Sequence, residues 1–559
     1  MESLILEHIN LWTAATTTKT AGRGNGASNT QLIGIQKLRE LILELAVRGK
    51  LIPQDPNDEP ASELLKRIQA ERKINKKLKN KKEEEAFSQT DNSDFPYNLP
   101  IGWEMVRLYQ IIQISSGDGL VSTKMNSAGD IPVFGGNGIT GFHDVSNVNK
   151  ETLVIGRVGY YCGSIHITPK KAWVTDNAFI TTFSVENIDI RFLYWLLKGT
   201  NLKENENATA QPVISGKKIY PIMVGLPPLA EQHRIVAKVD ELMALCDLLE
   251  KEQSQQLEAH ETLVETLLSA LTQTQDADDF RAMWLRIQEN FDILFTTENS
   301  VDKLKQTILQ LAVMGKLVTQ DPNDEPASVL LKKIATEKAR LVKEGKIKKQ
   351  AALPEITEEE KPFELPKGWE WVRLQEIVSL LGDGLHGTPE YTPNTEYYFV
   401  NGNNLVNGII EIKPDTKTVS YDEMLKYKKN LNDTTVLVSI NGTLGNIAFY
   451  NGEEIMLGKS ACYFNLVGSI NKSFIKSLIQ SPYFLTFAVK NATGTTIKNL
   501  GLKAMNEFPF ILPPFQEQQR IVSKVDELFS LCESLKVGIR KVQEIQNVMA
   551  EEIVKKVVR

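Results

Sequence analysis

The sequence has 559 residues, enough for three or four domains with separate cores, and its 42% hydrophobic and 24% charged residues are ordinary for a globular protein. No apolar run approaches the ~20 residues of a membrane-crossing helix, and the start does not resemble a signal peptide, so we expect a cytoplasmic protein without membrane contact. The four cysteines are far apart, which argues against a disulfide framework or a zinc site. The net charge of −6 gives no indication of nucleic-acid binding.

A block of sequence near the N-terminus recurs in the second half of the chain. Residues 38–68 and 304–334 are identical at 22 of 31 positions, with a constant offset of 266, and both contain QDPNDEPAS. A second block, which begins at Leu226 and again at Leu512, is identical at 16 of 25 positions with an offset of 286. The chain therefore contains one frame twice, around two regions that differ in sequence and in length.

These blocks divide the chain into six parts. In order they are an N-terminal arm (1–37), a proximal repeated helical region (38–98), domain 1 (99–228), a central repeated helical region with a spacer helix and the second copy of the proximal region (229–364), domain 2 (365–514) and a C-terminal repeated helix (515–559). Domains 1 and 2 show short β-rich runs broken by Gly, Asn and Pro, which is typical of mixed α/β domains. They share little sequence beyond Gly-Asp-Gly-Leu, at 117–120 and at 382–385.

Each copy of the second block predicts a long helix, because two prolines directly precede an apolar pattern of helical period. Apolar residues then recur in steps of four and three, which is typical of a coiled-coil seam. The seams consist of Ile235, Val239, Leu242, Cys246 and Leu249 in the first helix and of Ile521, Val525, Leu528, Cys532, Leu535, Ile539, Val542, Met549 and Ile553 in the second. Each helix is expected to run for about 40 residues, or roughly 60 Å.

Three polar residues, Gln253, Gln256 and His260, interrupt the first seam. They indicate either a frayed or register-shifted stretch or a polar layer that aligns the helix with its partner. The charged stretches at 73–85 and 338–349 are expected to be solvated helix or linker.

Two segments resemble nucleotide-binding loops but fail on their context. Gly136, Gly138 and Gly141 have the spacing of a dinucleotide loop, yet turn-like residues follow where that loop needs a helix. The segment 458–460 reads Gly-Lys-Ser, but Glu453 stands where a phosphate-binding loop needs a glycine. Both segments are better interpreted as loops of the two domains.

Other catalytic patterns are equally incomplete. Asp415 and Lys417 suggest a nuclease carboxylate cluster, but a second acid with its neighbouring lysine is missing. The six histidines are scattered, which argues against a metal site, and the Asn-Pro-Pro-aromatic element of adenine methyltransferases is absent. We therefore expect no catalytic residue and no metal site in this chain.

The repeated motifs resemble those of the specificity subunit of Type I restriction–modification enzymes. The resemblance rests on the L-P-P-x-x-E-Q-x-R-I-V helix starts, on GWE-x-VRL at 102–108 and 368–374, and on L-A-V-x-G-K-L at 45–51 and 311–317. It covers essentially the whole chain. It implies an α+β protein in which two mixed α/β target-recognition domains are separated by long helices, which form an antiparallel coiled coil with internal pseudo-two-fold symmetry.

The resemblance also implies a function and partners. Each target-recognition domain would read one half of a bipartite, asymmetric site in double-stranded DNA, while the helices set the spacing and dock two methyltransferase subunits. These subunits would use S-adenosylmethionine to methylate adenine, and two restriction subunits would use ATP and Mg²⁺ for translocation and cleavage. No cofactor and no catalysis are expected in this chain itself.

Direct readout of bases needs polar side chains on loops that enter the major groove. Candidates in domain 1 are Lys124, Asn137, Arg157, Tyr160, Lys170 and Lys171, with Lys217 and Lys218 as phosphate contacts, and candidates in domain 2 are His386, Asn403, Asn404, Asn441, Thr443, Lys459 and Lys498. Any of them could instead structure a loop. Residues 101–225 hold 11 basic and 10 acidic residues and residues 367–511 hold 13 of each, so we expect the methyltransferase subunits to supply much of the phosphate contact.

Three other classes of protein fit less well. A stand-alone bivalent DNA-binding regulator is expected to have a more basic surface. A single-chain modification enzyme needs methyltransferase motifs, and a bare coiled-coil scaffold leaves two divergent domains without a role. Co-purification with a methyltransferase distinguishes the first of these from a specificity subunit.

Overall fold

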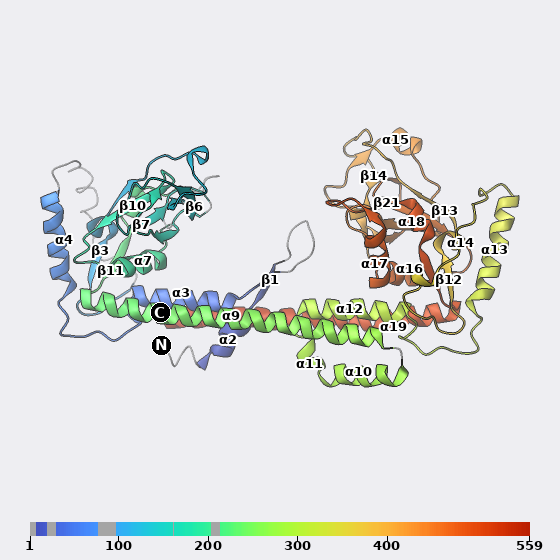
Figure 1. The fold of residues 1–559 in the computed structure, drawn as a ribbon, viewed down its shortest axis with the longest axis horizontal. Helices are drawn as coiled ribbons and strands as arrows, with labels where there is room; N and C mark the ends of the chain where they lie inside the picture. Colours follow the sequence, from blue (N-terminus) through green and yellow to red (C-terminus); the bar gives the residue numbers. More distant parts are fainter. Residues whose placement is uncertain are drawn as a thin grey trace. The chain divides into compact units, whose positions relative to one another are not determined.

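The computed structural model describes residues 7–19, 29–75, 97–159, 161–202, 213–274 and 276–558. The chain divides into two compact units, the first made of residues 1–256 and 542–559 and the second of residues 257–541. Each unit holds one copy of the helical frame and one of the two domains (Figure 1). The long helices α9 (Leu229–Gln273) and α19 (Phe515–Val558) each contribute one part to either unit.

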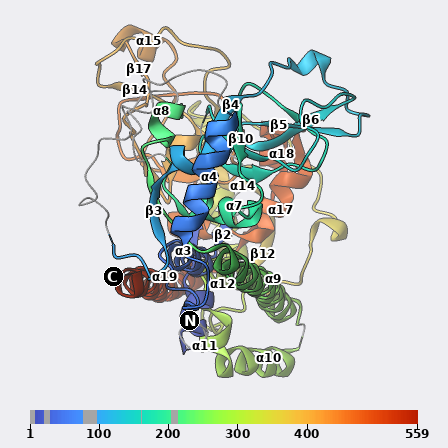
Figure 2. The ribbon, with the colours of Figure 1, turned by 90° about the vertical axis from the view of Figure 1, so that its left-hand side faces the viewer.

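The frame of the first unit is built from short helices beside the first part of α9. Its elements are α2 (Ile9–Ala14), β1 (Thr17–Lys19), β2 (Asn29–Gln31), α3 (Ile33–Val47) and α4 (Ala61–Asn75). Helix α3 buries Leu38, Leu41 and Ile42, and Arg39 forms an ion pair with Asp247 of α9 at 2.6 Å. Helix α4 lies beside domain 1 (Figure 1 and Figure 2). Arg72 of α4 donates to the carbonyl of Ile112 at 2.9 Å, which ties the helix to that domain.

Domain 1 contains three small sheets. Its elements are β3 (Glu104–Arg107), α6 (Leu108–Ile111), β4 (Ile112–Ser116), a 3-10 turn (Ser122–Lys124), β5 (Ile131–Gly135), β6 (Gly138–His143), β7 (Leu153–Gly156), β8 (Ile165–Ile167), β9 (Trp173–Val174), β10 (Ala178–Phe183), α7 (Ile190–Gly199), α8 (Gly216–Ile219) and β11 (Met223–Leu226). The strand orders are β4-β10-β7-β8, β6-β5-β9 and β3-β11, and only β5 and β9 are parallel among these described pairs. Asp189 caps α7 by accepting from the amides of Arg191 and Phe192.

The second unit repeats this plan with additions. Its elements are α10 (Ala277–Glu289), α11 (Phe291–Leu294), α12 (Glu298–Val313), α13 (Ala327–Lys343), a 3-10 turn (Glu358–Glu360), β12 (Glu370–Arg373), α14 (Leu374–Ile377), β13 (Val378–Asp383), β14 (Tyr397–Val400), a 3-10 turn (Gly402–Asn404), β15 (Leu405–Val406), β16 (Ile409–Ile410), β17 (Thr418–Val419), α15 (Tyr421–Lys426), β18 (Thr435–Ser439), β19 (Ile447–Phe449), β20 (Ile455–Leu457), β21 (Ala461–Leu466), α16 (Lys472–Ile479), α17 (Pro482–Asn491), β22 (Ala492–Thr493), β23 (Asn499–Leu500), α18 (Leu502–Glu507) and β24 (Pro509–Leu512). Ser481 caps α17, and Pro482 occupies its first turn, where a missing amide donor costs little.

Domains 1 and 2 share the order of their four-stranded sheet, a parallel pair and an antiparallel pair despite their different sequences, while the two-stranded sheets β15-β16 and β22-β23 are described in domain 2 alone. The four-stranded sheet is β13-β21-β18-β19 in domain 2, the parallel pair is β14 with β20, and the antiparallel pair is β12 with β24. The extra length of domain 2 lies largely between β14 and β18, where β15, β16, β17 and α15 stand in place of the single strand β6. Both domains are therefore mixed α/β, as the sequence predicts.

Within the second unit, α12 packs between the end of α9 and the start of α19. Asn299 and Lys303 of α12 bind Glu261 and Glu265 of α9, so these two helices run in the same direction. Lys305 and Asp302 of α12 pair with Glu533 and Lys536 of α19, in the opposite order along the chain. In this unit the two long helices are therefore antiparallel, and each packs on the short repeated helix between them.

The predicted seam of α19 is wrong in its last part. Val542 and Met549 are 54% and 51% exposed, whereas Ala550 is fully buried. The buried face has moved by one residue because the N-terminal arm covers the helix there, and Asn547 donates to the carbonyl of Thr16 at 3.2 Å. Polar contacts with Thr16 of the arm thus lie where the sequence predicts an apolar seam.

Two of the three polar positions of α9 have other roles than a layer between the long helices. Gln256 is exposed. His260 hydrogen-bonds through Nε2 to the carbonyl of Ile293 at 3.0 Å, and Ile293 belongs to α11. His260 therefore attaches the short α11 segment to α9 within the second unit.

Candidate DNA-reading edges and a repeated joint

Five loops of domain 2 meet at one edge of its sheets. The backbone amide of Leu385 donates to Leu457 O at 2.7 Å and that of Ile440 to Ser460 O at 3.0 Å. Gly442 N donates to Lys498 O at 2.9 Å, and Gly402 N donates to the hydroxyl of Ser460 at 2.9 Å. We call this surface loop edge 2. Its loops are 383–386, 401–403, 440–443, 458–460 and 498–499.

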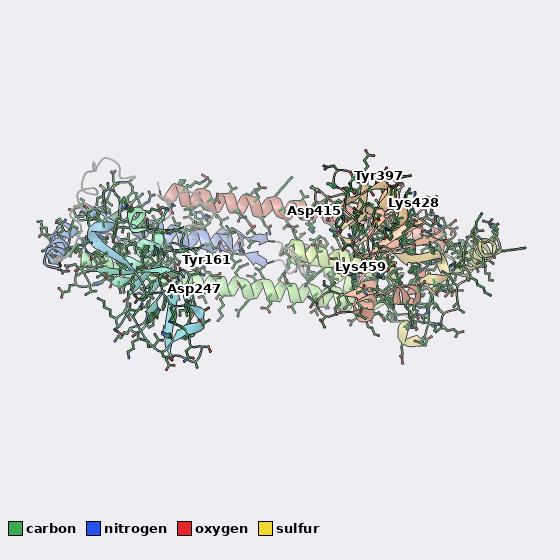
Figure 3. All side chains as sticks on the ribbon, turned by 90° about the horizontal axis from the view of Figure 1, so that it is seen from above. Tyr161, Asp247, Tyr397, Asp415, Lys428 and Lys459 are labelled. Carbon is green, nitrogen blue, oxygen red and sulfur yellow. The ribbon has the colours of Figure 1, made fainter. Side chains whose placement is uncertain are left out.

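Loop edge 2 collects most of the sequence-predicted candidates of domain 2. Lys459 is exposed at the turn between β20 and β21 (Figure 3). His386 pairs with Asp383 through its Nε2 at 2.5 Å, and the Asn441 amide donates to Asn499 at 3.0 Å. The other candidates on this edge are Asn403, Thr443 and Lys498, of which the first two are exposed.

Asn404 is the exception among the candidates of domain 2. It is 3% exposed, and its amide oxygen accepts from the backbone of Asn401 at 3.0 Å. Its amide nitrogen donates to Glu411 O and to the hydroxyl of Thr416, both at 3.0 Å. The side chain of Asn404 therefore holds the loop below the surface and is not presented at the edge.

Domain 1 has the corresponding surface, loop edge 1. Asp118 N donates to Val174 O at 3.0 Å and Thr175 N to Phe134 O at 2.9 Å. Arg157 N donates to Asn177 O at 2.9 Å, and Ile214 N donates to Arg157 O at 2.9 Å. The loops of this edge are 117–118, 136–137, 157–159, 175–177 and 213–214. It carries the candidates Asn137 and Arg157, and α8 with Lys217 and Lys218 follows directly.

Arg157 is held weakly for an arginine. Its guanidinium lies 5.3 Å from the ring centre of Phe179, and Nη1 has contacts of 3.4 Å with the Ser116 hydroxyl and 3.5 Å with Asp176 O. Its Nε is buried without a hydrogen-bond partner among the described residues. The buried Nε is out of reach of DNA, but the weakly held Nη1 is suited to bind a base edge or a phosphate.

The remaining described candidates of domain 1 lie outside the loops that form loop edge 1. Lys124 is exposed on the 3-10 turn between β4 and β5, and Lys170 and Lys171 are exposed in the loop between β8 and β9. Lys217 is exposed on α8, whereas Lys218 donates to Val213 O at 3.1 Å. Tyr160 lies outside the described residues.

Strand register shows which positions of the two edges correspond. Ala178 pairs with Gly156 and Ala461 with Ser439, so Arg157 corresponds to Ile440. The parallel pairs Phe134 with Val174 and Val400 with Leu457 make Asn137 correspond to Asn403. By the same register, Asp176 corresponds to Lys459. One asparagine is thus shared, while the charges at the neighbouring positions differ.

Sequence reasoning missed Asp176 and Asn177, which are exposed beside Arg157 on loop edge 1.

The Gly-Asp-Gly-Leu match between the two domains does not mark equivalent positions in space. An added Cβ at Gly117 would lie 2.3 Å from Val174 O, and one at Gly384 would lie 2.1 Å from Leu457 O. Gly117 therefore corresponds to Gly384, so the shared motif is shifted by two residues in space, and only strand register reveals these pairs.

The repeated sequence blocks meet at one point of each unit, which we call the joint. In joint 1 the carboxylate of Glu231, at the start of α9, accepts from the indole of Trp103 at 3.0 Å and from Gln54 at 3.3 Å. Arg234, one turn later, forms two hydrogen bonds with Asp58, at 3.2 and 2.6 Å. The motif E-Q-x-R thus ties α9 to domain 1 and to the loop after α3.

Joint 2 has the same contacts. Glu517 accepts from Trp369 at 2.8 Å and from Gln320 at 3.0 Å, and Arg520 binds Asp324 at 3.2 and 2.5 Å. Glu231 and Glu517 are each only 1% exposed. Burial raises the pKa of both carboxyl groups above the ordinary value, although the hydrogen bonds that they accept and the nearby arginine oppose the shift.

The middle glutamine of the motif attaches a second element. Gln232 accepts from the backbone amide of Asp189, the cap of α7, at 3.0 Å, and Gln518 accepts from that of Asn471, the cap of α16, at 3.0 Å. Both glutamine side chains are fully buried. Each domain is therefore held on its long helix through two separate sets of buried polar contacts.

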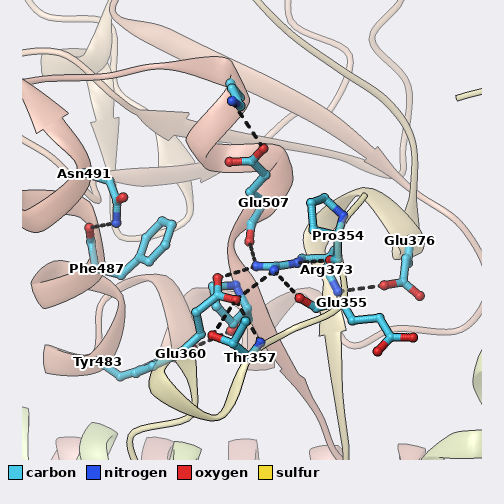
Figure 4. A network of polar contacts seen from close by, with 12 residues as sticks. Pro354, Glu355, Thr357, Glu360, Arg373, Glu376, Tyr483, Phe487, Asn491 and Glu507 are labelled. Carbon is cyan, nitrogen blue, oxygen red and sulfur yellow. Dashed lines mark hydrogen bonds and ion pairs between the residues drawn. The ribbon is translucent and has the colours of Figure 1, made fainter. Parts of the chain in front are cut away.

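The second unit has an additional anchor at Arg373. Its guanidinium binds the carboxylate of Glu360 at 2.7 and 2.9 Å and the carbonyls of Pro354, Glu355 and Glu507 (Figure 4). The Arg373 guanidinium holds the pKa of Glu360 below its usual range. These contacts fasten the linker before domain 2 to that domain.

The described residues contain no group of three or more His, Cys, Asp or Glu residues that could hold a metal ion. Among the helices of the described part of the chain, none is long and apolar enough to cross a membrane.

A duplicated helical frame that carries two α/β domains, each with a polar loop edge, defines a bivalent recognition protein. The chain belongs to the family of the Type I restriction modification DNA specificity domain, whose family model matches residues 100–259 and 366–544. It is a specificity subunit of this type, so DNA binding follows from its function.

Two curated relatives match nearly the whole chain. The Type I restriction enzyme EcoAI specificity subunit of Escherichia coli is 38% identical, and the alignment covers 99% of each chain. The EcoEI specificity subunit of the same organism is 35% identical with the same coverage. A solved chain from a structure of Type I restriction–modification complex assembly is 17% identical, with a TM-score of 0.48, and the match covers 83% of this chain and 99% of that chain.

Proposed function

We propose that each domain reads one half of a bipartite, asymmetric DNA site through its loop edge. The long helices set the spacing between the halves and dock two methyltransferase subunits, which direct adenine methylation or restriction at that site. The observation that carries this proposal is the pair of loop edges: the strand order is the same, but Arg157 and Asp176 in domain 1 stand where Ile440 and Lys459 stand in domain 2. Different side chains on one scaffold suit the reading of two different sequences.

The partners supply the chemistry in this proposal. S-adenosylmethionine binds to the methyltransferase subunits, while ATP and Mg²⁺ bind to two restriction subunits, and this chain contributes no catalytic group. The two domains are close to electrically neutral, with 11 basic against 10 acidic residues at 101–225 and 13 of each at 367–511. Sequence-independent attraction to DNA grows with the number of phosphates neutralised, so the methyltransferase subunits are expected to provide much of it.

Exchange of one domain tests whether each domain recognises its own half-site independently of the other. Residues 102–225 are replaced by the corresponding domain of another specificity subunit, and adenine methylation is mapped across a genome. One half of the recognised motif should change while the other half and the spacing stay the same. The matched control exchanges residues 368–511, which should change only the opposite half. A change in both halves from either exchange contradicts the proposal.

Assembly distinguishes the proposal from a stand-alone bivalent regulator. The tagged chain, co-expressed with its methyltransferase, should be recovered as a stable complex that binds its site more tightly and with a steeper salt dependence than the chain alone. Equally tight, salt-sensitive binding by the isolated chain would favour the regulator.

A further inference from the structure

The two joints connect elements whose relative angle matters for reading a split site. Joint 1 joins three parts of the first unit: the loop after α3 through Gln54 and Asp58, domain 1 through Trp103, and the start of α9 through Glu231 and Arg234. None of these residues belongs to loop edge 1. Their contacts therefore hold the domain on its helix without presenting side chains at the edge.

The geometry of the joint leaves little room for rocking. An added Cβ at Gly49, whose φ is +66°, would lie 2.4 Å from Pro100 and 2.9 Å from the Trp103 ring, and Gly315 is packed in the same way against Pro366 and Trp369. Hydrogen bonds to a buried carboxylate are short-ranged and directional, and a buried acceptor without its donor is costly. A small rotation of the domain would therefore break several contacts at once.

DNA makes strict demands on such an attachment. One additional base pair between two half-sites moves the second half by ~3.4 Å and turns it by roughly 35° around the duplex. A domain that could tilt freely on its helix would follow that change and accept both spacings. Rejection of the wrong spacing needs a stiff connection between reader and helix, because only then does misalignment cost binding energy.

We infer that the two joints fix the angle of each domain on its long helix and thereby determine how strictly the subunit selects the number of base pairs between the half-sites. This inference rests on the proposed function, since it presupposes two half-sites. Glu231 and Glu517 are positioning residues in this scheme. Their carboxylates hold the indole of the domain and the amide of the frame together.

The test measures methylation by the assembled methyltransferase complex on three DNAs that share both half-sites. Their spacers have the native length, one base pair less or one base pair more. The variants are Glu231→Gln and Trp103→Phe for joint 1, and Glu517→Gln and Trp369→Phe for joint 2. Gln keeps the shape of Glu but turns one acceptor into a donor, and Phe keeps an aromatic ring in place while removing the indole N–H.

Each joint variant should raise methylation of the altered spacers relative to the native spacer by about tenfold, and the pair Glu231→Gln with Glu517→Gln by about a hundredfold, since separated sites act additively. Discrimination against a wrong base in either half-site should not change. Lys238→Gln and Lys524→Gln are matched controls, because these lysines pair with Glu241 and Glu527 on their own helices at 3.1 and 2.9 Å. They should leave the spacer ratio as it is.

Methylation of the altered and native spacers is measured with one preparation of each variant. A partial loss of assembled complex therefore lowers both rates equally and leaves their ratio unchanged. If all four variants lower the overall rate but keep the native spacer ratio, the joints only stabilise the fold and the inference is overturned. The proposed function fails differently: the wild-type complex would then methylate a continuous motif or show no dependence on spacer length.

Discussion

The two domains differ most where their scaffolds agree best. β7 and β18 occupy the same place in the four-stranded sheet, yet the residue after the strand is Arg157 in domain 1 and Ile440 in domain 2. In the neighbouring loop, 175–177, Asp176 of domain 1 occupies the position of Lys459 in domain 2. The joints show the opposite pattern, since their glutamate, glutamine, arginine and tryptophan recur with nearly equal distances. The surface proposed to read DNA differs between the two domains, while the attachment is the same in both.

The largest expected effect is a loss of stability in one unit while the other unit keeps its stability. Trp103→Ala and Trp369→Ala each remove a buried ring and leave a cavity, so each should destabilise its own unit by ~3–5 kcal/mol. Hydrogen exchange measured on the intact chain should show faster exchange in the unit that carries the substitution. Equal loss of protection in both units from either variant would contradict two separately packed units.

A smaller effect is expected on base preference, and it should distinguish loop edge 1 from loop edge 2. Arg157→Ala and Lys459→Ala should each weaken the preference for particular bases in one half-site only, by about 1–3 kcal/mol. Methylation of a library randomised in both half-sites gives the preference for each position. Lys124→Ala, a lysine of domain 1 away from loop edge 1, is the matched control. Relaxed preference in both halves from one substitution would argue against separate readers.

The difference between α4 and α13 predicts that the stability of the second unit depends on pH. Arg72 of α4 corresponds to Lys338 of α13, whose amine donates to Gln375 O at 2.6 Å, and burial lowers the pKa of Lys338 to about 8. Because the folded state holds this proton less tightly than the unfolded state, the second unit should gain stability as the pH rises from 8 towards 10. The gain should be on the order of 1 kcal/mol, reduced by partial solvation.

The measurement is the difference in Tm between wild type and Lys338→Arg across this pH range. Arginine keeps its charge throughout, so the variant should lack the rise. A parallel pH profile for both proteins would rule out Lys338 as the source.

The smallest expected effect concerns the exposed ion pairs between the short and long helices. Arg39 with Asp247 in the first unit corresponds to Lys305 with Glu533 in the second, and both distances are 2.6 Å. Asp247→Asn and Glu533→Gln should each lower stability by less than ~1 kcal/mol, because solvent screens such pairs. The shift in Tm should shrink further at 0.5 M salt, and a shift that salt does not affect would point to packing instead.

The sequence by itself determined the duplicated frame, the starts of the long helices and the mixed α/β character of the domains. Repeats, proline positions and helical periods are local signals, so one chain suffices to read them. The first seam, from Ile235 to Cys246, is buried as predicted.

Only the tertiary structure decided how the two edges correspond and what the repeated motifs do. Residues far apart in the chain, such as Gln54, Trp103 and Glu231, meet through folding, and no spacing rule connects them. Strand register, not the shared Gly-Asp-Gly-Leu, shows that Asp176 corresponds to Lys459. The hydrogen bonds of Asn404 within its own loop hold its side chain below the surface. The prediction for the last seam residues of α19 was wrong for the same reason, because the arm that contacts this part of the helix is distant in sequence.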